Sequence, residues 1–248
     1  MNRLIIFSAD EYKKLLRHTK IKVLLALTII YSITMGIFRS VLENKTGIEL
    51  MTPGRFPVFL LELLTGLALP VLLIFIGSEL FASEFKDSTI KNLFALPVSK
   101  SIIYLGKLLA GAALLATILL TLAFSGLIVN TVISGLAAFT YVGSILVSYL
   151  GAFVYLVMVL LIVSFLTLLT GSPNMSIVIS LLIWIVTGIA GTFVASVRPF
   201  LPTNFASWYQ PIVNQTNFAA AVPELLYMLS YCVLFAVIGL IIFERKEV

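Results

Sequence analysis

The stretch SEFKDSTIKNLFALPVSKSIIYLGK, residues 83–107, separates two long apolar segments of this chain. It carries six charged side chains, whereas only 11% of the 248 residues are charged and 60% are hydrophobic. Water-soluble domains are about half apolar and about a quarter charged. The segments around this stretch therefore need a lipid bilayer as their solvent, and we expect contact with membrane lipid along most of the chain.

The apolar residues form segments long enough to cross a membrane, which takes about 20 mainly apolar residues per helix. Six segments meet this length, at residues 21–42, 58–83, 108–129, 140–170, 176–197 and 223–243. We therefore predict an all-α integral membrane protein in which residues 1–248 form a single transmembrane domain. The nearly apolar stretch 130–139 fits either a short loop or a re-entrant turn.

Lysine and arginine are unevenly distributed among the connections between these segments. With the N-terminus placed in the cytoplasm, twelve of the 16 basic residues lie on the cytoplasmic side and four, Arg39, Lys45, Arg55 and Arg198, lie outside. Basic residues collect on the cytoplasmic side of membrane proteins. We therefore expect both termini inside. The same bias explains the net charge of +5 without nucleic acid as a partner.

Residues 8–20, ahead of the first segment, have the pattern of a short amphipathic helix. Ser8 and Glu11 have the spacing of a capping box, in which serine and a glutamate three residues later cap a helix start. Tyr12 and Leu15 share one helical face. This pattern predicts a helix in the cytoplasmic membrane interface. A solvated basic flank that only sets the topology is the alternative.

The cytoplasmic loop 84–107 is patterned as a helix rather than as a plain connector. Asp87 or Ser88 can cap a helix from Thr89 to Leu96, and Pro97 would end it because proline lacks an N–H and clashes with the preceding turn. The apolar side chains of this helix require a groove, either in the same chain or in a partner. They are Ile90, Leu93, Phe94 and Leu96.

These residues resemble the loop that follows the second span in ABC-2 type transporter permeases, whose pattern is E-F-x-x-G-T-x-x-x-L-x-x-x-P-[VI]-S-[RK]. The amphipathic N-terminal helix and the six-span layout agree with the same family. Ser88 departs from the pattern, because the family often has glycine there. The residues that match are Glu84, Phe85, Thr89, Leu93, Pro97, Val98, Ser99 and Lys100.

The resemblance implies that the loop couples this chain to a separate ABC ATPase in the bacterial cytoplasmic membrane. Two ATPase copies and a second or homologous permease would complete the transporter, and the partner ATPase would bind ATP and Mg. The chain itself has no G-x-x-x-x-G-K-[ST] phosphate loop, so we expect no cofactor and no catalytic residue in it. The implied coupling residues are Glu84, Phe85, Lys86, Asp87, Thr89, Ile90, Lys91, Leu93, Phe94, Leu96 and Pro97.

The family resemblance and the apolar composition together suggest an exporter of a hydrophobic or amphipathic substrate. An antimicrobial or amphipathic peptide, exported for self-protection, is the first hypothesis, and polysaccharide, lipid or drug export stays open. An ion-coupled secondary transporter or a membrane enzyme is a more distant alternative. The only histidine is His18, and no adjacent pair of glutamates lies in a predicted span, which argues against histidine-dependent or glutamate-dependent intramembrane proteases.

Small and polar residues in the second and fifth segments indicate a substrate path between two copies of the chain. Such residues thin or bend a helix and let another surface approach it. Glu79 either pairs with a basic residue of the N-terminal helix or takes part in transport. The predicted path residues are Thr65, Gly66, Pro70, Gly77, Glu79, Thr187 and Gly191.

The sequence also gives expectations for two glutamates and for the aromatic residues on the predicted outer side. Glu62 is expected to reach the outer interface or to pair with Arg55, and Glu224 to lie in the first turn of a helix behind Pro223. The outer loop 198–222 is rich in aromatic residues, which fit either an interface belt or an exit gate. These residues are Phe200, Phe205, Trp208, Tyr209 and Phe218.

Overall fold

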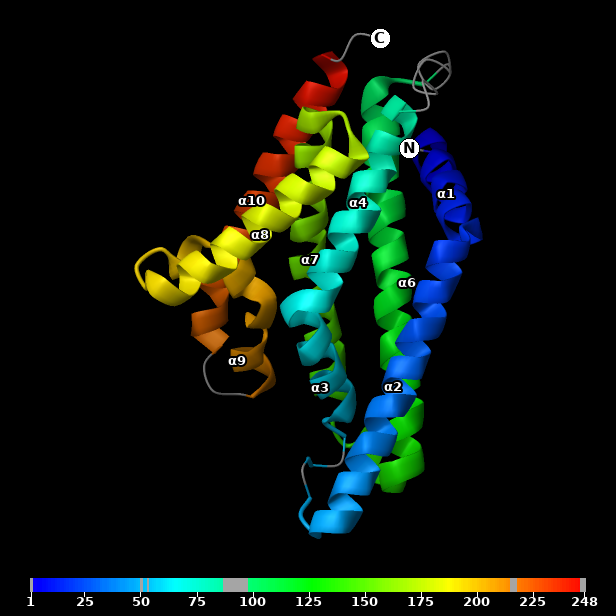
Figure 1. The fold of residues 1–248 in the computed structure, drawn as a ribbon, viewed down its shortest axis with the longest axis vertical. Helices are drawn as coiled ribbons and strands as arrows, with labels where there is room; N and C mark the ends of the chain where they lie inside the picture. The colour runs from blue at the N-terminus through cyan, green and yellow to red at the C-terminus, as the bar shows by residue number, and fades with distance from the viewer. Residues whose placement is uncertain (1, 50, 53, 87–97, 215–217, 246–248) are drawn as a thin grey trace.

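The fold is a helical bundle, seen in a computed structural model that describes residues 2–49, 51–52, 54–86, 98–214 and 218–245 (Figure 1). All regular elements in these ranges are helices, and six of them are long and apolar enough to cross a membrane. The predicted all-α membrane protein with six spanning helices is thereby confirmed. The six are Thr19–Thr46, Phe56–Phe81, Lys100–Ser134, Val142–Thr170, Pro173–Phe193 and Ala221–Arg245.

The described residues form long and short helical elements. The long helices are α1 (Asn2–Arg17), α2 (Thr19–Thr46), α3 (Phe56–Leu63), α4 (Leu69–Lys86), α6 (Lys100–Ser134), α7 (Val142–Thr170), α8 (Pro173–Phe193) and α10 (Phe218–Arg245). The short ones are the π-helix η1 (Leu64–Ala68), the 3-10 helices η2 (Gly135–Phe139), η3 (Arg198–Phe200) and η4 (Pro202–Ser207), and α9 (Gln210–Val213). The stretch 130–139 is thus the end of α6 followed by η2.

Helix α7 forms the centre of the bundle. Of its most apolar stretch 61% is buried inside the protein, against 11% for α8 and for α10, so these two lie at the periphery. Figure 1 shows α2 flanking α6 on one side of the bundle and α8 leaning away on the other. Ala152, Tyr155 and Leu156 of α7 are fully buried. This segment is also the most hydrophobic of the six, with a mean hydropathy of 2.8.

Hydroxyl groups join the helices inside the bundle. Ser32 of α2 and Ser125 of α6 lie 2.8 Å apart, oxygen to oxygen. Ser176 of α8 lies 3.0 Å from Ser78 of α4 and 2.6 Å from Thr167 of α7. Small hydroxyl residues allow helices to approach closely, and their hydrogen bonds replace those that water would make.

The second spanning helix is interrupted by the π-helix η1, two to six residues ahead of Pro70. Proline has no N–H, and in a regular α-helix its ring would clash with the carbonyl of Gly66, four residues earlier. The chain widens instead, so that the N–H of Leu69 donates to the carbonyl of Leu64. The bend expected at Pro70 therefore takes the form of a π turn.

Helix α1 begins at Asn2, so the predicted capping box at Ser8 is wrong. The Ser8 hydroxyl lies inside the helix and donates to the carbonyl of Ile5 at 3.0 Å. The helix starts early because Phe7 packs on Gly106 of α6, where an added Cβ would collide with the phenylalanine ring. Figure 1 shows α1 beside α6, and the helix ends where His18 adopts extended backbone.

Residues 198–214, between α8 and α10, lie in the predicted outer loop and are called the outer segment below. This segment folds back against α7. Phe205, Trp208 and Tyr209 are buried, and the Trp208 indole N–H donates to the carbonyl of Gly151 at 2.9 Å. A Cβ at Gly151 would lie 2.6 Å from that of Tyr209, so only glycine admits this ring. Burial raises the pKa of the Tyr209 phenol far above its usual value. The interface-belt interpretation is wrong for these three aromatic residues.

Candidate functional site

The predicted coupling residues fall at the end of α4 and beyond it. Glu84, Phe85 and Lys86 form the last residues of α4, which continues past the expected span end at residue 83. The remaining eight lie outside the described residues. They are Asp87, Thr89, Ile90, Lys91, Leu93, Phe94, Leu96 and Pro97. What the structure describes is therefore the framework from which this loop emerges.

A buried lysine, Lys107, organises that framework. It lies in the second turn of α6 and is only 2% exposed. Its Nζ donates to Glu11 Oε2 of α1 at 3.1 Å and to the carbonyl of Leu80 in α4 at 3.2 Å. One ammonium group thus joins α1 to the two helices that bracket the loop. Glu11 is itself 15% exposed, so the pair is largely shielded from water.

The sequence pattern did not indicate that Lys107 would be buried and would join three helices. A lysine directly before the apolar run from Leu108 is a signal, because ionisable residues next to or inside spans usually have a named partner. The identity of the partner of Lys107, however, could not be predicted from the sequence. Glu11 lies 96 residues away in sequence, in a helix whose start and docking surface were not predictable from its own pattern.

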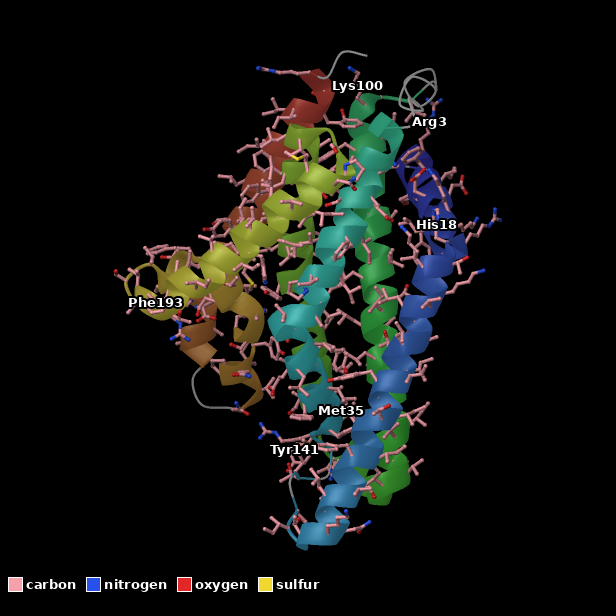
Figure 2. The ribbon with its side chains drawn as sticks, viewed as in Figure 1. Arg3, His18, Met35, Lys100, Tyr141 and Phe193 are labelled. Atoms are coloured by element: carbon pink, nitrogen blue, oxygen red, sulfur yellow. The ribbon has the colours of Figure 1, made fainter. Side chains whose placement is uncertain are left out.

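The end of α10 also meets the start of α6. The Ser101 hydroxyl donates to Glu244 Oε1 at 2.6 Å, and Lys100 Nζ donates to the carbonyl of Glu244 at 3.1 Å. Figure 2 shows Lys100 and Arg3 at the same end of the molecule, with Tyr141 toward the other. Three elements, α1, α4 and α10, therefore hold the first turns of α6 at the loop end of the bundle.

Glu79 forms an ion pair with Lys20, with 2.5 Å between Oε1 and Nζ. The predicted pairing with a basic residue of the N-terminal region is confirmed, although Lys20 is the second residue of α2. Both side chains are more than half exposed, so the pair contributes little stability. A cavity of about 390 Å³ lies between this pair and the Glu11–Lys107 pair.

Two of the predicted path residues line one groove. Gly66 of η1 and Gly191 of α8 border an open groove of about 640 Å³ between the second span, α8 and the outer segment. Neither glycine has a neighbour that would block a side chain: a Cβ at Gly66 meets nothing within 4 Å, and one at Gly191 lies 3.4 Å from Leu201. The remaining wall includes Trp184 and Gly188.

The other predicted path residues lie outside this groove. Thr65 is buried and donates to the carbonyl of Leu61 at 2.9 Å. Gly77 packs against Val163 and Leu160 of α7, and Pro70 is buried as well. These three residues make contacts within one chain. The sequence alone could not distinguish residues used for such packing from residues that line a substrate path. Thr187 and Glu79 are also absent from the groove wall.

The expected pairing of Glu62 with Arg55 is wrong. Glu62 Oε1 accepts from Gln210 Nε2 at 3.1 Å, and Arg55 donates to Asn214 Oδ1. The outer segment returns to the second span, so each charge finds a neutral amide there rather than the other charge. The expectation for Glu224 is also wrong, because α10 begins at Phe218 and contains Pro223 in its interior.

A second buried cation was missed on the outer side. Arg39 of α2 is 5% exposed, and its Nε donates to Glu43 Oε1 at 2.9 Å. Its other nitrogens donate to Asn130 Oδ1 of α6 and to the carbonyl of Met51, each at 3.3 Å. The residue had been counted only as an outer charge. In the structure it ties the outer end of α2 to α6.

Replacing Lys107 by glutamine is expected to destabilise the bundle and release α1. Removing one partner of a buried ion pair typically costs about 3–5 kcal/mol, because the other charge stays buried. The matched control is Lys13→Gln: Lys13 pairs with Asp10 across exposed surface, at 68% and 69% exposure, and its loss should change little. Thermal unfolding in detergent and proteolysis within α1 measure both variants. Equal behaviour of the two would contradict the anchoring role.

The family of the chain follows from comparison with known proteins. A family described as ABC-2 family transporter protein matches residues 9–188, which is more than half of the 248 residues. The matched range includes the Glu11–Lys107 pair, residues 84–107 and most of α8. Comparison with curated proteins gives no match. With six membrane-spanning helices and this match, the chain is a multi-pass membrane protein that belongs to the ABC-2 transporter family.

Proposed function

We propose that the chain is the permease subunit of an ATP-driven exporter, working with a separate ABC ATPase. The observation that carries this is the anchoring of both helices that bracket residues 87–97 to α1 through Lys107. A loop that only connected two spans would not need a buried ion pair at its base. A loop that receives force from a partner needs a stiff base, since force is otherwise lost in local bending.

In the proposed mechanism, the ATPase holds the apolar side chains of the loop, with Leu93 and Phe94 at the centre. Two ATPase copies bind ATP and Mg between them, and a second permease, identical or homologous, completes the assembly. Closure of the ATPases moves the loop, and Lys107 transmits the movement to α1, α4 and α6 together. The termini and the loop are cytoplasmic in this arrangement, in a bacterial cytoplasmic membrane.

The proposed cargo is hydrophobic or amphipathic. The groove beside Gly66 and Gly191 is lined mainly by apolar side chains, so it offers little compensation for the desolvation of a strongly charged solute. An amphipathic peptide exported for self-protection remains the first candidate from the sequence, with polysaccharide, lipid or drug export as the alternatives. A secondary transporter or a membrane enzyme remains the distant alternative, and no contact among the described residues favours either.

Phe94→Asp is expected to leave the chain inserted in the membrane but to abolish ATPase binding. A carboxylate in an apolar groove loses its hydration without gaining a partner. The control is Phe139→Asp, which makes the same change at an exposed position of η2, in the connection at the other end of the bundle. Co-purification with the cognate ABC ATPase, co-expressed with the chain, measures the effect. Full ATPase recovery with Phe94→Asp, together with intact export, would refute the assignment.

The orientation is testable by labelling single cysteines after Cys232 is replaced. A membrane-impermeant thiol reagent added to intact cells is expected to label Thr46→Cys and Asn214→Cys, which are exposed at the proposed outer side. It should label Ile90→Cys only after the cells are opened. Labelling of position 90 from outside would reverse the proposed topology.

Filling the groove is expected to stop export without affecting assembly. Gly66→Trp and Gly191→Trp introduce indole rings where the backbone leaves room for a Cβ. Gly143→Trp is the matched control, because a Cβ at this exposed glycine of α7 also meets nothing within 4 Å and lies away from the groove. ATP-dependent export and ATPase co-purification are measured in parallel. If both groove variants export as the control does, the path lies elsewhere.

A further inference from the structure

The groove beside the second span contains a single charge. Glycines and apolar side chains of η1 and α8 form most of its wall, Thr192, Thr203 and Asn204 add polar groups, and Arg198 is the one charged residue on it. Arg198 comes from η3, at the start of the outer segment. It therefore supplies one cationic end to a mainly apolar groove.

The guanidinium group is held in place at that end. Arg198 Nε donates to Asn204 Oδ1 at 3.0 Å, and both residues line the groove. The same two residues also line a neighbouring polar cavity of about 460 Å³, whose wall includes Gln210, Asn214 and one acidic residue, Glu224. Arg198 thus lies where an apolar surface meets a polar one. Its two terminal nitrogens have no partner among the described residues and remain able to bind a ligand.

We propose that this groove binds a lipid-like amphiphile with an anionic head group, either a carboxylate or a phosphate. The planar arginine fork donates two parallel hydrogen bonds to such groups, which a neutral head group cannot match. The hydrocarbon chain would lie along Gly66, Trp184 and Gly188. The open side of the groove is flanked by exposed apolar residues of α8, so a lipid has direct access from the bilayer.

A lipid chain fits this groove better than a peptide. Of the wall side chains on η1 and α8, only Trp184 and Thr192 carry polar groups, and the Thr192 hydroxyl already donates to the carbonyl of Ile189 at 2.7 Å. The backbone amides of a bound peptide would therefore lose most of their hydrogen bonds to water without replacement. A hydrocarbon chain has no such groups. The inference rests on the proposed function only for the role of the amphiphile as cargo. Binding itself requires neither ATP nor the ATPase.

The chain contains a built-in reporter for this binding. It has two tryptophans: Trp184 lines the groove, and Trp208 is 7% exposed, with its indole bonded to the carbonyl of Gly151. A brominated stearate added to the purified chain in nanodiscs of uncharged lipid is expected to quench Trp184 saturably. Trp184→Phe should remove that quenching. Saturable quenching that survives in Trp184→Phe would place the ligand elsewhere and overturn the proposal.

Arg198→Gln is expected to weaken stearate binding at least about tenfold, because one charge-assisted interaction is lost. Lys45→Gln, which removes another exposed outer charge away from the groove, should bind as the original does. Gly188→Leu serves as a second variant, because it fills the groove at a position with no neighbour within 4 Å and leaves Arg198 intact. It should also abolish quenching, with an unchanged unfolding temperature. Unaltered binding in both variants would overturn the proposal.

Three further probes define the head group. Brominated phosphatidic acid binding more tightly than stearate identifies a phosphate head group, and the reverse identifies a carboxylate. The methyl ester of the brominated stearate should show no saturable quenching; binding equal to that of the acid would overturn the requirement for an anion. Displacement of stearate by an uncharged amphipathic peptide at lower concentration would overturn the ligand class. ATPase co-purification, measured separately, shows whether the proposed function fails independently.

Discussion

A polar group inside this bundle has no water to bind, and that constraint shapes the buried polar contacts described above. Lys107 is tolerated because a carboxylate and a carbonyl receive its hydrogens. Arg39 is tolerated because three elements supply acceptors around it. The hydroxyl of Ser176 meets those of two other helices. Each of these three groups is therefore also a cross-link between segments of the bundle.

These cross-links are not spread evenly, so some parts of the bundle are held together by more interhelical hydrogen bonds than others. The loop end is held by Lys107 and by the contacts of Glu244 with the start of α6. By contrast, α8 and α10 bury little of their surface and leave the groove beside Gly66 open. A stiff base at the loop end and a loosely covered groove farther along the bundle suit the proposed function, in which force enters at one end and a ligand is handled away from it.

Features that depend on local composition could be predicted from the sequence. Features that depend on contacts between residues far apart in the chain could not. Apolar length alone gave six spans, and the pattern from Glu84 to Lys100 gave the family. The start of α1 was missed because it depends on Phe7 meeting Gly106, a contact invisible in local periodicity. The small residues of the second span looked alike, yet only Gly66 faces the groove while Gly77 faces α7. The size of a residue does not determine which surface packs against that residue.

The π turn of η1 has a consequence for how the second span evolves and tolerates change. A π turn holds one more residue than the α turn it replaces, so it offsets the side-chain faces of α3 and α4 by roughly 100° relative to an unbroken helix. The stretch Phe56–Lys86 therefore carries two separate packing registers in one rod. Deleting one residue at Leu64–Ala68 would restore a single register and turn the outer half away from α6 and α7, although every residue of α3 would be unchanged.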